Sequence, residues 1–140
     1  MQKVTVKSQP QPYTVTITNS RHSWMGDEPT NLGGADAGPT AFELLLGSVG
    51  ACVAITVQMY ARRKGWPLEG VALELEHTKI EAADCEDCKT EKGKISEIKL
   101  RLNLQGALSE EQRERIFQIA GRCPVKRTLE AEVKFRTELA

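Results

Sequence analysis

One stretch of the sequence, residues 40–64, limits the possible folds more than any other. It contains no proline, and residues 44–60 are apolar nearly all round a helix. Such a helix has no face suited to water, so protein or lipid must surround it. A membrane-spanning helix needs about 20 predominantly apolar residues. This run is shorter and contains polar side chains at Ser48, Thr56 and Gln58. We therefore expect a central helix wrapped by sheet, and no membrane role.

The sequence also marks both ends of this helix. Residues 31–39 form a glycine-rich stretch that ends with Pro39, at or just before the expected helix start. Near the other end, a basic run complements the negative end of the helix dipole. This run is Arg62, Arg63 and Lys64. Gly65 and Pro67 are then expected to stop the helix.

Most of the remaining chain shows the alternation of apolar and polar residues that is typical of strands. This pattern occurs at residues 4–6 and 13–17, on either side of a proline-containing turn, and it predicts a hairpin. Residues 71–75 and 95–104 show the same pattern and predict two further strands. We expect the polar link between them, residues 81–94, to be solvated.

Two short helices and a last strand are predicted after these strands. Ser109 and Gln112 have the spacing of a capping box. The predicted apolar face of the helix that follows consists of Ile116, Phe117, Ile119 and Ala120. This helix should end near Gly121, and residues 124–129 should form another, since proline suits a first helical turn. Residues 133–137 alternate again and predict a final strand, so the fold class is α+β and mostly antiparallel.

The composition fits a single globular domain, residues 1–140, with 40% hydrophobic and 27% charged residues. The 19 basic and 19 acidic residues cancel, so no broad basic surface is available to bind nucleic acid. The first residues lack the apolar run of a secretory signal, and we expect a cytoplasmic protein. In that reducing compartment, four cysteines are less typical of a disulfide framework than of redox chemistry, metal binding or burial.

Cys52 and Cys123 are the first candidates for chemistry. Cys52 lies in the most apolar part of the sequence, where a free cysteine is commonly just a small hydrophobic residue. A reactive Cys52 would need a cation from elsewhere, for which Arg21 is the first candidate. Cys123 stands directly before Pro124 at a predicted helix N-terminus, where positive potential favours the thiolate. Local electrostatics alone would therefore make Cys123 the nucleophile and Cys52 its partner.

Cys85 and Cys88 form a CxxC motif with two acidic residues between them. A structural zinc site usually has four ligands, and no second CxxC or histidine pair is present, although His77 or a partner chain could contribute. Acidic neighbours oppose thiolate formation and hence a thioredoxin-like role. A plain loop without metal is the leading interpretation, with zinc and redox sites as open alternatives. We expect His22 and His77 to be surface or strand histidines rather than ligands.

Several short motifs together resemble one known family. They are Gly33-Gly34, Gly38-Pro39-Thr40, Glu43-Leu44-Leu45-Leu46, Gly50-Ala51-Cys52 and Arg122-Cys123-Pro124-Val125. In this combination they resemble the OsmC/Ohr family, particularly its YhfA-like branch, from about Arg21 through the last predicted strand. The resemblance implies an OsmC-like fold, in which antiparallel sheets wrap the long central helices of an intertwined homodimer. It also implies thiol sites where the subunits meet.

The resemblance further implies reduction of organic hydroperoxides. In the family, the thiolate in the long helix attacks the peroxide to give a sulfenic acid and an alcohol, and the cysteine before proline then forms a disulfide that an external dithiol reduces. On this pattern Cys52 attacks, Cys123 resolves and Arg21 stabilises the thiolate, with Glu43 as the candidate to hold the arginine. An apolar pocket suits a small hydrophobic hydroperoxide, and neither a cofactor nor a metal is required.

One position departs from the family pattern. The family's peroxidases place a glutamate ten residues before the peroxidatic cysteine to hold the activating arginine, but this position is Phe42 here. Nine residues of helix turn roughly 180° and climb about 13 Å, so Glu43 cannot face Cys52 along a straight helix. Glu43 could act through an irregular helix start or at the partner's site, or it could simply cap the helix or bind Arg21.

This departure leaves two other functions open. The chain could be a non-enzymatic, dimeric ligand-binding or redox-sensing module that lacks efficient thiol activation, with Phe42 as the discriminating residue. A third hypothesis is a zinc-dependent protein that uses Cys85 and Cys88. The sequence does not identify the physiological hydroperoxide or the reductant.

Overall fold

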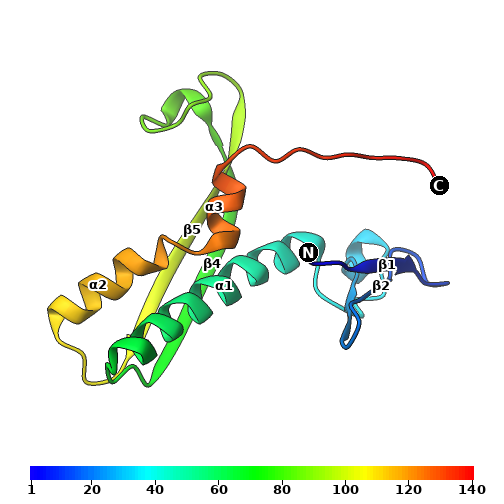
Figure 1. The fold of residues 1–140 in the computed structure, drawn as a ribbon. Helices are drawn as coiled ribbons and strands as arrows, with labels where there is room; N and C mark the ends of the chain where they lie inside the picture. Colours follow the sequence, from blue (N-terminus) through cyan, green and yellow to red (C-terminus); the bar gives the residue numbers. More distant parts are fainter. The chain divides into compact units, whose positions relative to one another are not determined.

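The computed structural model describes residues 1–140 and divides them into two compact units, residues 1–45 and 46–140. Figure 1 shows the chain with its helices and strands. Their bounds are β1 (Thr5–Ser8), β2 (Val15–Thr18), β3 (Ser23–Gly26), α1 (Ala41–Lys64), β4 (Gly70–Glu81), β5 (Lys94–Gln105), α2 (Glu110–Ala120) and α3 (Pro124–Glu130), with 3-10 turns η1 (Thr30–Leu32) and η2 (Ala82–Asp84). The α+β class is therefore confirmed. The prediction of a single domain, residues 1–140, stays a prediction.

The first unit is built on a three-stranded antiparallel sheet in the order β1-β2-β3. Ile17 in the middle strand lies opposite Val6 of β1 and Trp24 of β3. The predicted hairpin is confirmed as β1 and β2, although Tyr13 lies outside the strand with a φ of 69°. The sequence pattern does not predict β3, because its four residues include the adjacent apolar pair Trp24 and Met25 instead of a clear alternation.

A buried carboxylate joins this sheet to the glycine-rich stretch before α1. Asp27 Oδ2 accepts hydrogen bonds from the Thr14 hydroxyl at 2.7 Å and the Ala37 N–H at 3.1 Å, and Oδ1 accepts one from the Glu28 N–H at 2.8 Å. Burial by itself raises the pKa of Asp27, but these bonds and one from the Ala35 N–H outweigh it and hold the pKa below the ordinary value. The ionised Asp27 thus fixes the path of the chain into α1.

Gly34 is required by the close approach of this stretch to the chain after β3. A Cβ atom built on Gly34 would lie 1.9 Å from the Glu28 carbonyl oxygen and 2.9 Å from Asp27 Oδ1. No rotamer change relieves a clash with a backbone oxygen. The Gly33-Gly34 pair therefore has a structural reason in this chain, independent of any family resemblance.

The second unit is organised by the long antiparallel hairpin of β4 and β5, which is visible in Figure 1. The apolar residues of the two strands pair across the hairpin and so share one face. These pairs are Val71 with Leu104, Leu73 with Leu102 and Leu75 with Leu100. The opposite face carries polar pairs such as Glu74 and Arg101, whose charged groups lie 3.7 Å apart. Both strands were predicted, and β4 extends beyond residue 75 through Glu81 because its pairing with β5 continues.

Helices α1 and α2 cover the apolar face of this hairpin. The buried cluster consists of Val49, Val53, Val57, Tyr60, Ile116, Ile119, Ala120 and Cys123, with the hairpin leucines packed against it. A Cβ atom on Gly50 would lie 2.9 Å from Leu75 Cδ1, so the small residue allows α1 to lie close to β4. The other side of α1 is exposed in this chain, with Ile55 55% and Met59 66% accessible.

The ends of α1 agree with the sequence analysis. The helix begins at Ala41 and ends at Lys64, and Gly65 follows in the left-handed region with a φ of 68°. Length and composition alone would let α1 cross a membrane, but the core helix of a soluble protein meets the same criterion. The packing of its inner face against the hairpin favours the second interpretation.

Helix α2 begins with the predicted capping box. The Ser109 hydroxyl accepts from the Gln112 N–H, and the Gln112 side chain accepts from the Ser109 N–H. The prediction that Phe117 belongs to the apolar face of this helix is wrong, since Phe117 is 64% exposed while Ile116 is fully buried. Each residue advances a helix by roughly 100°, so Phe117 lies well off the face shared by Ile116 and Ile119. Arg115 Nε donates to the Tyr60 hydroxyl at 3.2 Å and links α2 to α1.

The predicted final strand at residues 133–137 is wrong. Residues 131–140 form no helix or strand, and Phe135 is 84% exposed. Alternation shows that a segment could lie at a sheet edge, but a strand also needs a partner with free backbone groups. No strand of this chain pairs with the segment.

We expect Gly34→Ala to lower the free energy of unfolding by about 1–3 kcal/mol, because the new methyl group would overlap the Glu28 carbonyl oxygen. Gly47→Ala is the matched control, since a Cβ at this exposed helical position meets nothing within 4 Å. Alanine there should raise the free energy of unfolding by about 0.5–1 kcal/mol. Urea denaturation followed by circular dichroism measures both, and equal stability of the two variants would contradict the close approach at Gly34.

Candidate functional site

Helix α1 places Cys52 at the boundary of the buried cluster. Cys52 lies between Val49 and Val53 in sequence, both of which are buried, and its own side chain is half-buried against the same cluster. The thiol therefore has an apolar surrounding on one side and remains partly accessible on the other. In the single chain, the core therefore does not fully enclose Cys52.

The short connection between α2 and α3 places Cys123. The N–H of Cys123 donates to the Ala120 carbonyl oxygen at 3.4 Å, and Pro124 takes the first position of α3, where an N–H is not needed. Cys123 is the N-cap residue, and its Sγ accepts from the Lys126 N–H at 3.4 Å. The Cys123 side chain is fully buried.

The two thiols meet inside the second unit. Burial raises the pKa of Cys123, and the neighbouring Cys52 side chain raises it further through a hydrogen bond and through its charge. The N–H groups of Lys126 and Val125 act in the opposite direction by stabilising a thiolate on Cys123. They do not outweigh burial, and the pKa of Cys123 stays above its ordinary value.

This balance opposes the expectation from local electrostatics alone, and the roles of the two cysteines stay predictions. The positive helix N-terminus at Cys123 is present, but Cys123 is buried and keeps its proton more firmly than an ordinary thiol. Of the pair, Cys52 is half-buried and Cys123 is buried. Two thiols in contact, one accessible and one buried, can form a disulfide after oxidation of the first.

Arg21 and Glu43 belong to the first unit, whereas both thiols belong to the second. Arg21 is exposed between β2 and β3, and its N–H donates to Asn19 Oδ1 at 2.8 Å. Glu43 Oε2 accepts from the Thr40 N–H at 2.9 Å, and the Thr40 hydroxyl accepts from the Glu43 N–H at 3.2 Å. Glu43 thus caps α1, one of the alternatives from the sequence, and the Thr-x-x-Glu spacing carries that signal. Catalytic roles for Arg21 and Glu43 stay predictions.

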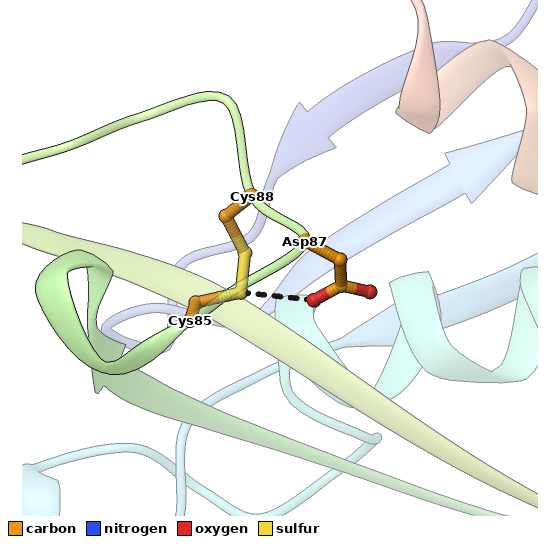
Figure 2. Close-up of a disulfide and its surroundings, with 3 residues drawn as sticks. All are labelled: Cys85, Asp87 and Cys88. Carbon is orange, nitrogen blue, oxygen red and sulfur yellow. Dashed lines mark hydrogen bonds between the residues drawn. A yellow bond between two sulfur atoms is a disulfide. The ribbon is translucent and has the colours of Figure 1, made fainter.

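Cys85 and Cys88 form a disulfide in the loop between β4 and β5, which is shown in Figure 2. The sequence favours a plain loop and does not predict this bond, because disulfides are rare in a reducing compartment. His77, considered as a metal ligand, lies on β4 with its Nε2 3.0 Å from the Ser96 hydroxyl. His22 lies in an exposed turn, where its N–H donates to Asn19 Oδ1.

The chain is similar to proteins of one family. Residues 33–138 match the family model described as OsmC-like protein. No curated protein matches the sequence. The matches do not separate branches of the family, so the YhfA-like branch stays a prediction.

Solved structures with the same fold include an OsmC-like protein from Mycoplasma pneumoniae, with a TM-score of 0.69, 20% identity, and coverage of 93% of this chain and 87% of that one. An organic hydroperoxide resistance protein OsmC from Legionella pneumophila has a TM-score of 0.63 and 18% identity over 92% and 88% of the two chains. The organic hydroperoxide resistance protein OhrB of Bacillus subtilis has a TM-score of 0.60 and 15% identity over 91% and 88%. At these identities the likeness shows the fold.

Because the folded pKa of Cys123 is raised, this thiol contributes stability that is fully present below the pKa of an unfolded cysteine, about 8.5. That contribution is lost as pH rises through the folded pKa. We therefore expect the free energy of unfolding to fall more steeply above about pH 8.5 in the wild type than in Cys123→Ser. Urea denaturation across this range, with a phosphine reductant present, measures the two slopes. Identical slopes would contradict the raised pKa.

Proposed function

The chain belongs to the OsmC-like protein family, and from this premise we propose that it is a thiol-dependent peroxidase acting on organic hydroperoxides through Cys52 and Cys123. The observation that carries the proposal is the contact between an accessible and a buried thiol. Two relatives of the same fold, from Legionella pneumophila and Bacillus subtilis, are named organic hydroperoxide resistance proteins. Their names support a role in oxidative stress defence, which is part of the proposal.

In the first step, the Cys52 thiolate attacks the outer peroxide oxygen. The O–O bond breaks, Cys52 becomes a sulfenic acid, and the leaving alkoxide takes up a proton to give the alcohol. Accessibility supports Cys52 in this role, since Cys123 is fully buried and has a raised pKa. Arg21 is proposed to stabilise the thiolate and the developing oxyanion, with Glu43 as the candidate to hold the arginine.

In the second step, the Cys123 sulfur attacks the sulfenic sulfur. A Cys52–Cys123 disulfide forms, and the sulfenic oxygen leaves as water with the thiol proton. The interaction of Cys52 with Cys123, which raises the pKa of Cys123, supports this role because it places the two side chains near each other. An external dithiol then returns both cysteines to thiols and is itself oxidised to a disulfide. This cycle requires neither a metal nor a bound cofactor.

We expect cumene hydroperoxide to remove both free thiols of the Cys85→Ser/Cys88→Ser variant, which leaves only Cys52 and Cys123 to react. Cys52→Ser in that background should lower turnover to below about 1% of the parent, because the attacking sulfur is lost. Thiol titration and coupled peroxide consumption provide the two measurements. An unchanged thiol count, or full turnover by Cys52→Ser, would defeat the proposal.

The matched control is Cys123→Ser in the same background. This variant should undergo one oxidation, stall without a resolving thiol, and proceed to sulfinic acid with excess peroxide. Intact mass spectrometry distinguishes the added oxygen atoms from the loss of two hydrogens in a disulfide. A peroxide-treated parent that gains oxygen atoms as Cys123→Ser does, instead of losing two hydrogens, would contradict the assignment of the resolving cysteine.

The alternative function is a non-enzymatic, dimeric ligand-binding or redox-sensing module. Two observations favour it: Phe42 stands where the family's peroxidases have a glutamate, and the Glu43 carboxylate is engaged at the Thr40 cap. The rate of Cys52 alkylation as a function of pH separates the two functions. A midpoint near or above about 8.5, the value of a free thiol, favours the binding module.

We also propose that the protein is a cytoplasmic homodimer, as the family resemblance implies. The exposed side of α1 supports a subunit contact, since it presents Ile55 and Met59 to solvent beside a hollow of about 470 Å³ that Trp66 and Leu68 also line. Water-exposed apolar side chains of this size on a long helix are typical of subunit interfaces.

The wild type should sediment as a dimer, and Met59→Glu should shift it toward the monomer, because a charge would be buried in the contact. Glu74→Gln on the polar face of the hairpin is the control and should remain dimeric. Analytical ultracentrifugation measures both. A monomeric wild type would contradict the homodimer.

A further inference from the structure

The loop between β4 and β5 holds a second pair of cysteines that the proposed peroxide chemistry does not use. Figure 1 shows this loop at one end of the long hairpin. Its base is fixed by a hydrogen bond from the Ala82 N–H to the Gly93 carbonyl oxygen at 2.7 Å, and Ala82 itself is 2% exposed. The η2 turn then leads directly into Cys85, whose N–H donates to the Ala82 carbonyl oxygen. A defined backbone therefore presents the two cysteines.

Three potential metal ligands converge in this loop. The sulfur atoms of Cys85 and Cys88 and a carboxylate oxygen of Asp87 all lie within 4.8 Å of one another. Figure 2 shows the Asp87 carboxylate turned toward the sulfur pair, with Oδ1 3.3 Å from Cys85 Sγ. Asp87 is exposed and the two cysteines are half-buried, so an ion could enter from solvent.

The spacing of the two cysteines suits a shared ion as well as a disulfide. Their Cα atoms are 5.5 Å apart. Zinc binds thiolate sulfur at about 2.3 Å in tetrahedral geometry, which separates two bound sulfurs by about 3.8 Å. After reduction of the bond, rotation of the two side chains can provide that separation without moving the backbone.

The charge of the loop favours a bound cation over thiol–disulfide exchange. Asp84, Glu86 and Asp87 flank the cysteines directly, and Lys89 after Cys88 is the one positive neighbour. Negative neighbours oppose a free thiolate, so the reduced pair is a poor nucleophile at neutral pH. The same charges attract a divalent cation, whose positive charge makes coordinated thiolates favourable.

We propose that the reduced loop binds one thiophilic divalent cation of the zinc type through Cys85, Cys88 and Asp87, with solvent in the fourth position. The disulfide is the form of the loop that cannot bind the ion. Reduction by a phosphine and water converts the disulfide to two thiols and the phosphine to its oxide. Binding of Zn²⁺ to those thiols then releases two protons. The site is independent of Cys52, Cys123 and the proposed peroxidase cycle.

The test uses the full chain after anaerobic reduction with a phosphine and removal of the reductant. Zn²⁺ is titrated in competition with a chromophoric chelator, and Co²⁺ is used in parallel because thiolate ligands produce a charge-transfer band. We expect one equivalent of Zn²⁺ per chain in the reduced wild type and none at the loop after oxidation by diamide. Asp87→Asn should weaken the affinity at least about tenfold, because it removes a charged ligand.

Two double variants distinguish this loop from the other thiol pair. Cys85→Ser/Cys88→Ser should lose the bound Zn²⁺ and the cobalt charge-transfer band, while Cys52→Ser/Cys123→Ser should retain both. The loop is exposed, and circular dichroism checks that each variant is folded. Equal zinc binding by Cys85→Ser/Cys88→Ser and the wild type would overturn the proposal, as would loss of binding in Cys52→Ser/Cys123→Ser. Failure of the peroxidase test leaves this result unaffected, since the two experiments use different cysteines.

Discussion

The packing of α1 against the β4–β5 hairpin is the interaction on which the second unit depends. The residues of α1 that enter the core include Val49, Val53 and Val57, and β-branched residues have only modest intrinsic preference for a helix. Burying each such side chain contributes about 1.5–3 kcal/mol, so packing rather than propensity stabilises the helix. Gly50 permits the close approach to Leu75, and the same contact brings Cys52 to the edge of the core.

The thiol pair shows how burial and local backbone charge compete. The local surroundings of Cys123 are typical of a reactive cysteine. Pro124 follows it at the start of α3, and the Lys126 N–H donates to its sulfur. Ile116 and its neighbours nevertheless enclose Cys123 in the core, and desolvation outweighs the favourable N–H groups. Cys52 lacks a helix N-terminus but is accessible to solvent on one side. The proposed division of roles, in which the half-buried sulfur reacts first and the buried sulfur follows, rests on this difference in burial.

The two cysteine pairs lie in opposite surroundings, and this difference separates their chemistry. Cys52 and Cys123 meet among aliphatic side chains, where an organic substrate is soluble and a charged ion is costly. Cys85 and Cys88 lie in an exposed acidic loop, where a cation is favoured and a free thiolate is not. Peroxide chemistry suits the first pair, and metal binding suits the second. The proposals for the two pairs can thus be tested independently.

The sequence by itself determined the features that depend on neighbouring residues. The ends of α1, the Ser109 capping box and the alternation along β4 and β5 follow from local preference and periodicity. The structure confirms these features, although β4 continues beyond the predicted residues to Glu81. The short motifs around Cys52 and Cys123 likewise identified the family.

Only the tertiary structure decided which sulfurs meet and which of them is buried. Cys52 and Cys123 are 71 positions apart in the printed numbering, and no periodicity specifies contacts over that separation. The pKa of Cys123 depends on desolvation by side chains from other elements, which a local pattern cannot indicate. The segment around Phe135 has the alternation of a strand, but no strand of the chain pairs with it. The role of Asp27 also depends on tertiary contacts, because groups distant in sequence, such as the Thr14 hydroxyl, donate hydrogen bonds to its carboxylate.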